Sequence, residues 1–556
     1  MERYWLKHYP AGLAPDINPD AYPSVAELLK QACERFATRA AFLSFDVALS
    51  YAEWDRQSDL LARALVHQYG LKRGDRVAIM MPNLLQYPIA LLAILRAGMV
   101  VVNTNPLYTP RELSHQLSDA NVKAIIAFEN AAWVIAETLK TVPVEHVILT
   151  RIGDRLGGVK GLLINSVIKY VKKQIKPYAI NRVHWFNEVL RRGADFPSAD
   201  VAVSSQEIAF LQYTGGTTGI SKGAILSHRN MVANILQSEA WLNTFAINRT
   251  QIQVVAAALP LYHIFALTAV ALLYAYKGAC SVLIANPRDT DGFVKLLKKT
   301  PCTVYAAVNT LYNAMLNHPK FHEVDFSKIN TSVAGGMALQ SAVAKRWQAV
   351  TGSELTQGWG LTETSPVLTI MPPQTPFNNS AGQPIPSTEI AIVNDAGEFL
   401  KVGDSGEIVA RGPQVMSGYW QRPNETEKVF LPGGWFRTGD IGHMDQQGFV
   451  FIEDRKKDMI LVSGFNVYPN EVEEVLSAHP KILEVAAVAK PDEHSGESVA
   501  VFVVAKDPSL TSQEVVSFAR TGLTGYKVPH TVIFRKELPK TNVGKILRRA
   551  LREELH

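Results

Sequence analysis

The stretch from Tyr213 to Ala224 brings together residue types that can hold a phosphate chain. It reads YTGGTTGISKGA, with four glycines, three threonines, one serine and one lysine. Glycines let the backbone approach a ligand closely, while hydroxyls, backbone N–H groups and a lysine can bind phosphate oxygens. A turn on a surface hairpin rarely combines these residue types, so we predict a phosphate loop after the apolar run 208–211. It is not a Walker A loop, because Lys222 is followed by Gly223 rather than by serine or threonine.

Two further segments could complete a nucleotide site. Residues 357–364 read QGWGLTET, where Trp359 offers a flat face to a purine and Glu363 offers oxygen ligands to Mg²⁺, a hard cation that also binds substrate phosphates. Residues 435–440 read WFRTGD, and an aspartate after a Thr-Gly turn can accept hydrogen bonds from sugar hydroxyls. Each acidic residue alone is usually a solvated turn residue. Their combination with a phosphate loop favours nucleotide binding.

Lys545 and His263 also have ordinary structural interpretations. Lys545 lies in the glycine-containing segment 540–545, where a lysine is normally just solvated. His263, in the segment 260–265, can equally be a hydrogen-bonded core histidine. If His263 belongs to a site, we expect it to position a substrate rather than act as a base, because a carboxylate needs no base at neutral pH.

These motifs, in this order and over nearly the whole chain, resemble those of the adenylate-forming (acyl-CoA synthetase) superfamily. The segment 434–473, with its run DRKKDMILVSGFNVYPNE, closely resembles the signature of bacterial long-chain fatty acyl-CoA synthetases. Two positions depart from that pattern. Trp359 stands where tyrosine is usual, which removes a hydroxyl, and Phe436-Arg437 replaces the common Leu-His.

The resemblance assigns roles to residues of this chain. Its catalytic residues are Lys545, Glu363, Thr214 and His263, with Thr214 and Glu363 as metal ligands. Lys545 would hold the substrate carboxylate against the α-phosphate and stabilise charge in the transition state. The residues expected to bind nucleotide or coenzyme are Tyr213, Thr214, Gly215, Gly216, Thr217, Thr218, Gly219, Ile220, Ser221, Lys222, Gly223, Ala224, Gly335, Gly336, Gln357, Gly358, Trp359, Thr362, Asp440, Arg455, Lys457, Gly464 and Lys545.

The same resemblance implies a reaction in two steps. A fatty carboxylate would attack the α-phosphate of Mg²⁺-ATP, and the thiol of coenzyme A would then attack the acyl-adenylate. Lys457 would be the hinge between two domain arrangements, and Gly464 would line a tunnel for coenzyme A. A medium-chain or aryl acid–CoA ligase is the alternative within the superfamily. A membrane-associated fatty-acid binding or uptake factor is the alternative from another class, and the presence of Lys545 and Glu363 argues against it.

Alternating strand and helix signals must position these residues. Strands are expected at 76–82, 99–104 and 122–128, with a helix at 87–97 and another starting at Thr109. Such alternation argues for a parallel α/β sheet. Short strands and turns dominate 382–454. The expected fold is therefore α/β: an N-terminal AMP-binding domain, 1–455, of α/β sheets with a small β-barrel-like subdomain, and a small mobile α+β domain, 456–556. The active site would lie between them.

The composition of the chain indicates where in the cell the protein is expected to act. The 556 residues include 56 Lys+Arg and 51 Asp+Glu, a net charge of +5, which is too mild to argue for nucleic-acid binding. Three cysteines lie far apart, without metal-ligand spacing, which fits a reducing cytosol. The first ten residues lack the apolar core of a signal peptide. We expect a cytoplasmic enzyme, and a homodimer is compatible with the sequence.

Two segments bear on membrane contact. Residues 254–276 contain no Asp, Glu, Lys or Arg, but Pro260 and His263 interrupt them, so a buried strand, a loop and a buried helix are expected rather than a membrane span. A basic amphipathic helix is expected around 164–176. Its apolar stripe is Ile164, Val167, Ile168, Val171 and Ile175, and its lysines are Lys169, Lys172, Lys173 and Lys176. Packing on the protein and peripheral contact with an anionic membrane are both open for this helix.

Overall fold

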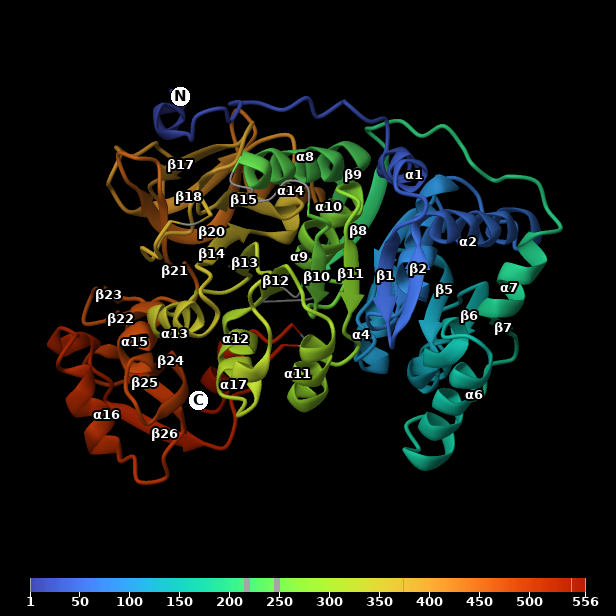
Figure 1. Ribbon diagram of the computed structural model, residues 1–556. Helices are drawn as coiled ribbons and strands as arrows, with labels where there is room; N and C mark the ends of the chain where they lie inside the picture. The colour runs from blue at the N-terminus through green and yellow to red at the C-terminus, as the bar shows by residue number, and fades with distance from the viewer. Residues whose placement is uncertain (1, 215–220, 245–250, 374, 542, 556) are drawn as a thin grey trace.

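The described residues build four β-sheets, three before residue 456 and one after it. Figure 1 shows how these sheets lie in the molecule. The computed structural model describes residues 2–214, 221–244, 251–373, 375–541 and 543–555. The C-terminal sheet and its helices pack below the other three, so the cavity described below is lined by both parts of the chain.

The seven-stranded sheet contains the three strands predicted near the N-terminus. Neighbouring strands are parallel except for the last pair, as strand–helix alternation predicts. In spatial order the strands are β7 (Val183–Trp185), β6 (His146–Thr150), β5 (Val122–Phe128), β3 (Arg76–Met80), β4 (Val100–Asn103), β8 (Ile208–Thr214) and β9 (Lys222–Ser227).

The nine-stranded sheet forms the centre of the molecule. Its middle strands are parallel and apolar, and antiparallel strands close both edges. The order is β16 (Gln383–Pro384), β15 (Val367–Ile370), β14 (Leu355–Gly360), β13 (Thr331–Gly335), β12 (Val304–Ala307), β10 (Val254–Ala257), β11 (Cys280–Leu283), β1 (Ala40–Ser44) and β2 (Val47–Ser50).

Helices cover both of these sheets and bury their apolar faces. Every residue of α3 is buried, which its almost wholly apolar sequence allows. Helix α4 begins where predicted, with a capping box between Thr109 and Glu112 and Pro110 in the first turn. The helices are α1 (Val25–Arg35), α2 (Tyr51–Arg63), α3 (Gln86–Arg96), α4 (Pro110–Asp119), α5 (Ala132–Thr138), α7 (Phe186–Gly193), α8 (His228–Thr244), α11 (Thr290–Lys299), α12 (Asn309–Leu316) and α13 (Ser341–Thr351). Short 3₁₀ or π turns are η1 (Tyr4–His8), η2 (Ala64–Gln68), η3 (Glu129–Ala131), η4 (Ile152–Arg155), η7 (Phe321–Glu323), η8 (Thr362–Thr364) and η9 (Gly525–Lys527).

The segment around the predicted phosphate loop departs from expectation in one respect. Strands β8 and β9 are antiparallel neighbours, with Thr214 opposite Lys222, so the segment between them joins the two strands of a hairpin. A turn between hairpin strands and a phosphate loop are therefore compatible here, and the expectation that one excludes the other is wrong. Gly223 and Ala224, placed in the loop by sequence, belong to β9 because they extend its pairing with β8.

Two smaller β-sheets complete the chain. The predicted β-rich region is a five-stranded antiparallel sheet with one short helix, consisting of β17 (Glu389–Val393), β18 (Gly406–Arg411), α14 (Pro423–Lys428), β19 (Phe430–Leu431), β20 (Trp435–Met444) and β21 (Val450–Arg455). The C-terminal part has its own apolar core and contains β22 (Ile460–Val462), β23 (Phe465–Val467), α15 (Pro469–Ser477), β24 (Ile482–Asp492), β25 (Gly496–Ala505), α16 (Ser512–Ala519), β26 (Thr531–Arg535) and α17 (Arg548–Glu553).

The uncharged segment 254–276 forms a buried strand, a loop and buried helical turns, as predicted. After β10 the chain continues as α9 (Ile264–Ala266), η6 (Leu267–Leu272) and α10 (Leu273–Tyr276). Within the described ranges, no helix is both long and apolar enough to cross a membrane.

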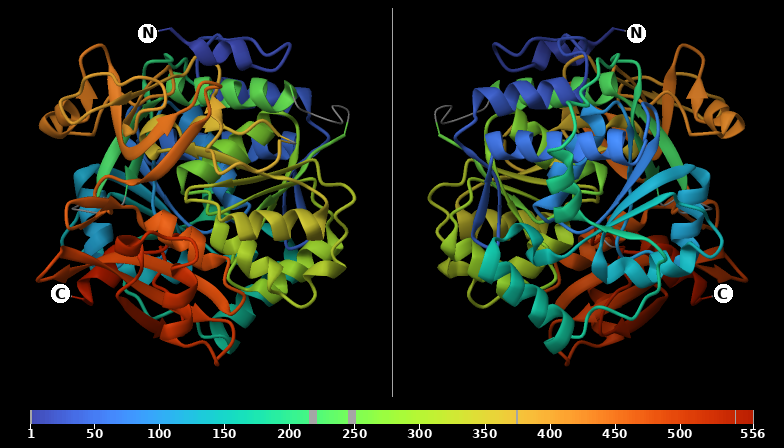
Figure 2. Two further views of the ribbon diagram at one scale, coloured as in Figure 1. Left: turned by 90° about the vertical axis from the view of Figure 1, so that its left-hand side faces the viewer. Right: turned by 90° about the vertical axis from the view of Figure 1, so that its right-hand side faces the viewer.

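A helical finger, residues 158–176, projects from the edge of the seven-stranded sheet (Figures 1 and 2). It comprises α6 (Gly158–Ser166) and η5 (Val167–Val171). The helix was predicted to continue to Lys176, but it stops at Val171: Lys173 has a φ of 48°, and Pro177 follows. The predicted apolar stripe is only partly covered: Ile164 and Ile168 are half-buried, whereas the following apolar side chains face solvent: Val159, Leu162, Leu163, Val167, Tyr170 and Val171.

Candidate active site

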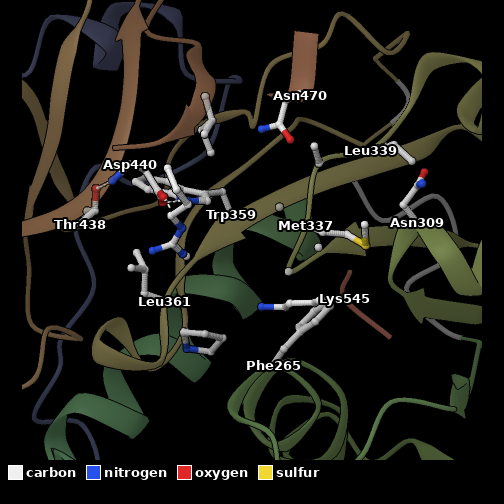
Figure 3. A pocket seen from close by; sticks show the side chains of 18 of the residues that line it. Phe265, Asn309, Met337, Leu339, Trp359, Leu361, Thr438, Asp440, Asn470 and Lys545 are labelled. Atoms are coloured by element: carbon white, nitrogen blue, oxygen red, sulfur yellow. Dashed lines mark hydrogen bonds and ion pairs between the residues drawn. The ribbon is translucent and has the colours of Figure 1, made fainter. Parts of the chain in front are cut away.

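A cavity of about 1640 Å³ lies between the C-terminal domain and the sheets of the N-terminal part. It receives the ends of parallel strands β13 and β14, the edge where ligands bind in open α/β sheets. Figure 3 shows Trp359, Asp440 and Thr438 on one side of the cavity, with Lys545 extending toward them from the other. The structure therefore brings together segments that are far apart in the sequence.

Asp440 has both carboxylate oxygens engaged inside the cavity wall. Arg455 Nε lies 2.6 Å from Oδ1, and the indole Nε1–H of Trp359 donates to Oδ2 at 2.8 Å. Burial raises the pKa of Asp440, while Arg455 and Trp359 oppose that rise. The unusual tryptophan thus orients this carboxylate as well as offering a flat ring. Each carboxylate oxygen of Asp440 keeps a lone pair that can accept a hydrogen bond from a sugar hydroxyl.

The side chain of Lys545 enters the cavity and packs next to Gly336. A Cβ added at Gly336, whose φ is 81°, would stand 3.3 Å from Cε of Lys545, so a larger residue there would press on the lysine. Burial lowers the pKa of Lys545 to about 8, helped by the charge of Arg455 and opposed by Asp440 and Glu363. The lysine thus carries its charge at neutral pH, close to its titration range.

His263 caps the short helix α9. Its Nδ1 accepts a hydrogen bond from the backbone N–H of Phe265 at 3.3 Å, which leaves the ring proton on Nε2. Burial, together with the charge of Lys545, lowers the pKa of His263 to about 3. A neutral imidazole with a free N–H donor can orient an oxygen of a substrate, which agrees with the positioning role expected from sequence.

Glu363 lies in η8, with one carboxylate oxygen held and the other without a hydrogen bond within the described structure. The hydroxyl of Tyr419 donates to Oε1 at 2.8 Å. No cluster of three or more His, Cys, Asp or Glu side chains suited to a metal occurs among the described residues. The residues nevertheless fit Mg²⁺, which often takes only one or two protein oxygens and completes its shell with water and phosphate. Glu363 and the hydroxyl of Thr214 at the end of β8 supply such oxygens.

The described residues at both ends of the predicted phosphate loop contact the surrounding elements. Tyr213 donates from its hydroxyl to Asp119 at 2.6 Å, and the backbone carbonyl of Ser221 lies 2.8 Å from Nε2 of His115. Lys222 forms an ion pair with Glu425. The central residues of the predicted loop lie outside the described residues: Gly215, Gly216, Thr217, Thr218, Gly219 and Ile220.

Most other predicted residues also line the cavity. Gln357 is buried, and its side-chain oxygen has no hydrogen-bond partner in the described structure, so it can accept from a ligand. Gly335, Gly336, Gln357, Gly358, Trp359, Thr362, Asp440, Arg455 and Lys457 line the same cavity. Gly464 does not: it occupies an exposed turn between β22 and β23, with a φ of 84°.

Four residues near the site carried no signal in the sequence. Tyr419 holds Glu363, Glu425 pairs with Lys222, and Asp119 accepts from Tyr213. Arg548 forms ion pairs with Asp454 at 3.1 Å and Glu473 at 2.8 Å. For Glu425, Asp119 and Arg548, only their charge could have suggested a pairing, and many other residues are charged.

Comparison with known proteins agrees with this geometry. The family model described as AMP-binding enzyme matches residues 29–420, and the one for the AMP-binding enzyme C-terminal domain matches 471–545. These matches fall on either side of the boundary at 455, which stays a prediction.

Curated relatives match the chain over its whole length. The sequence is 50% identical to a long-chain-fatty-acid–CoA ligase of Yersinia pestis over 556 residues, covering 100% of this chain and 98% of that protein. It is 49% identical to the enzyme of the same name from Escherichia coli O157:H7 over 555 residues, with the same coverage. Among solved structures, an anthranilate CoA ligase in complex with anthranoyl-AMP superposes with a TM-score of 0.84 at 23% identity, covering 97% of this chain and 99% of that one. That likeness shows the fold.

Proposed function

The chain belongs to the AMP-binding enzyme family, and from this premise we propose that it is a long-chain fatty acid–CoA ligase that works through an acyl-adenylate. The observation that carries the proposal is the identity of about half of all residues with curated ligases of that activity, over full length. The cavity supports it, because a lysine, an oxygen ligand for a hard cation and a carboxylate suited to a ribose line the same space.

In the first step, we assign the nucleotide to the side of the cavity formed by β14, β20 and β21. Asp440 and Arg455 would hold the ribose, and Gln357 would accept from the adenine. Lys545 would bridge the fatty carboxylate and the α-phosphate and stabilise the extra negative charge as the new P–O bond forms and pyrophosphate leaves. The Nε2–H of His263 would orient a carboxylate oxygen.

Mg²⁺, when bound, would neutralise phosphate charge as pyrophosphate departs. Glu363 and Thr214 would hold it, with Tyr419 fixing the orientation of Glu363. Lys222 would have to exchange its pairing with Glu425 for the phosphates of the nucleotide, since one ammonium cannot satisfy both equally well.

In the second step, the thiol of coenzyme A would attack the carbonyl of the acyl-adenylate, forming a thioester and releasing AMP. Gly464 lies outside the cavity in the present domain arrangement, so a tunnel lined by it would require the C-terminal domain to rotate about Lys457. The present arrangement, with Lys545 in the cavity, suits the first step.

Pyrophosphate release across a panel of acids tests this function. Octadecanoate should be activated with a higher kcat/KM than octanoate or benzoate, and thioester should form only when coenzyme A is added. Preference for an aryl or medium-chain acid would replace the long-chain assignment. Glu363→Gln should raise the Mg²⁺ concentration needed for half-maximal rate, because an amide is a poorer ligand for a hard cation than a carboxylate.

We further propose that the helical finger contacts anionic membranes. Its exposed apolar side chains include Val159, Leu162 and Val171, each at least 70% exposed. Residues 156–187 contain no Asp or Glu, and Lys169, Lys172, Lys173 and Lys176 are exposed. Apolar side chains with surrounding lysines suit the boundary of an anionic bilayer, where each lysine adds about 1 kcal/mol.

Co-sedimentation with phosphatidylglycerol-containing vesicles tests this contact. Binding should weaken as salt rises, and Glu at the four lysine positions should abolish it. Lys506→Glu with Lys536→Glu, two exposed lysines of the C-terminal domain, is the matched control and should bind like the unaltered protein. Unchanged binding after reversal of the finger lysines would mean that the finger is not the membrane contact.

A further inference from the structure

One part of the cavity is built by helices rather than by strand ends. Helices α8 and α10 and the turn η6 contribute Ser238, Leu242, Ala269, Leu273 and Tyr274 to the lining. No Lys, Arg, Asp or Glu of these three elements lines the cavity. Two hydroxyls, those of Ser238 and Tyr274, therefore stand in an otherwise apolar lining.

Tyr274 is a buried tyrosine that lines the cavity and has no partner for its hydroxyl among the described residues. Its side chain is 4% exposed, and its hydroxyl forms no hydrogen bond within the described structure. Buried tyrosines normally find a partner, and three others here do. Tyr51 donates to the carbonyl of Ala279, Tyr87 to that of Leu261, and Tyr312 to that of Val333. Burial raises the pKa of Tyr274, so its hydroxyl remains a hydrogen-bond donor at any ordinary pH.

Ser238 presents the same situation on the adjoining helix. It is 2% exposed, and its Oγ has no hydrogen-bond partner in the described part of the chain. Helices α8 and α10 pack against each other. An unpaired buried hydroxyl is unfavourable, and a pair of them beside one cavity calls for a partner that enters the cavity.

We infer that this end of the cavity recognises fatty acids whose chain carries a hydroxyl group, and the inference rests on the function proposed above. A substrate hydroxyl can accept a hydrogen bond from Tyr274 and donate one to Ser238, which satisfies both groups. A second carboxylate on the chain would be rejected, because no cation from these helices lines the cavity and a buried unpaired charge is strongly disfavoured.

Tyr274→Phe tests the inference, since it removes only the oxygen. The kcat/KM of acyl-CoA formation is compared for octadecanoate and its monohydroxy positional isomers. For the unaltered protein, one isomer should be used distinctly better than its neighbours along the chain. Tyr274→Phe should lower kcat/KM for that isomer about tenfold and leave octadecanoate unchanged. Ser238→Ala should act in the same direction.

Tyr305→Phe is the matched control. Tyr305 is buried and its hydroxyl is also unpartnered in the described structure, but it does not line the cavity. This variant should treat all acids like the unaltered protein. Equal losses on octadecanoate and on every isomer with Tyr274→Phe, or no preferred isomer in the unaltered protein, would overturn the inference. Failure to activate octadecanoate at all would instead refute the proposed function.

Discussion

Asp440, Trp359 and Glu363 stand on one wall of the cavity, on strands or a turn continuous with the buried sheets, whereas Lys545 on the other wall comes from a loop of the C-terminal domain. Strand β14, which carries Trp359, is paired on both sides by β13 and β15. Moving Trp359 would require breaking these sheet contacts. The first wall is thus fixed by the core.

Polar contacts between side chains and loops attach the second wall to the rest of the protein. Thr310 donates to the carbonyl of Gly544 at 2.8 Å, and Asn313 to that of Leu483 at 2.9 Å. Arg548 pairs with Asp454 at 3.1 Å, and the backbone N–H of Ser341 donates to the carboxylate of Glu474 at 3.3 Å. Such contacts can be exchanged for others without unfolding either domain. From the difference between the walls we propose that the core preforms the nucleotide site, whereas Lys545 enters it in only one domain arrangement.

Lys545→Ala should distinguish the contributions of the two walls most clearly. The first wall should still bind ATP, but adenylate formation should fall about 10²–10³-fold, because one preorganised donor to the developing charge is lost. Conversion of supplied acyl-adenylate to acyl-CoA should be spared. Pyrophosphate exchange and single-turnover thioester formation measure the two steps. An equal fall in both would mean that Lys545 serves the whole cavity rather than the first step.

Lys457→Pro addresses the connection between the walls. Proline fixes φ and restricts the preceding residue, so rotation of the C-terminal domain should be hindered. No described hydrogen bond uses the backbone N–H of Lys457, so the present arrangement should survive. We expect thioester formation to fall roughly a hundredfold, which corresponds to about 2.7 kcal/mol in the barrier, while pyrophosphate exchange persists. Lys457→Arg is the control: it keeps the positive charge and an unrestricted φ, so it should retain both steps.

The first wall was largely predictable because its residues lie in short local motifs. Three strands and one helix begin and end within two residues of the predicted positions: β3, β4, β5 and α3. Their bounds were predictable because apolar runs in the sequence mark the segments that are buried. Short motifs in the sequence also identified the cavity-lining Gly335, Gly358 and Asp440, although the expected turn before Asp440 is part of strand β20.

The contacts that orient these residues were not predictable. Tyr419 and Glu363 are 56 positions apart, and Lys222 and Glu425 are 203 apart, so their pairing depends on how sheets pack rather than on local sequence. The helical finger, residues 158–176, is another case in which local sequence did not predict the contacts. Periodicity identified a helix, but which of its faces is covered depends on neighbouring elements that periodicity does not describe.

The pH dependence of the first step should report the environment of Lys545. A lysine is charged below its pKa, so with a pKa of about 8 its contribution is present at neutral pH and is lost as pH rises through 8. The kcat/KM for ATP in pyrophosphate exchange should fall up to tenfold per pH unit above that point. Lys545→Arg keeps the charge, so whatever activity it retains should show no such fall. The same decline in the arginine variant would assign the titration to another group, such as Lys457, whose pKa burial also lowers to about 8.

The smallest expected effect tests whether the first wall is as rigid as its strand pairing implies. Tyr419→Phe removes the hydroxyl that donates to Glu363 but keeps the ring beside Lys222, whose Nζ lies 5.3 Å from the ring centre. Loss of one hydrogen bond costs about 1 kcal/mol, so the Mg²⁺ concentration for half-maximal pyrophosphate exchange should rise about fivefold. Manganese binding by paramagnetic resonance, in the presence of a non-hydrolysable ATP analogue, should weaken by the same factor. Trp420→Phe is the control: it removes the neighbouring donor to the carbonyl of Asp119 and should leave metal affinity unchanged. Unchanged affinity in Tyr419→Phe would mean that the backbone of η8 alone orients Glu363.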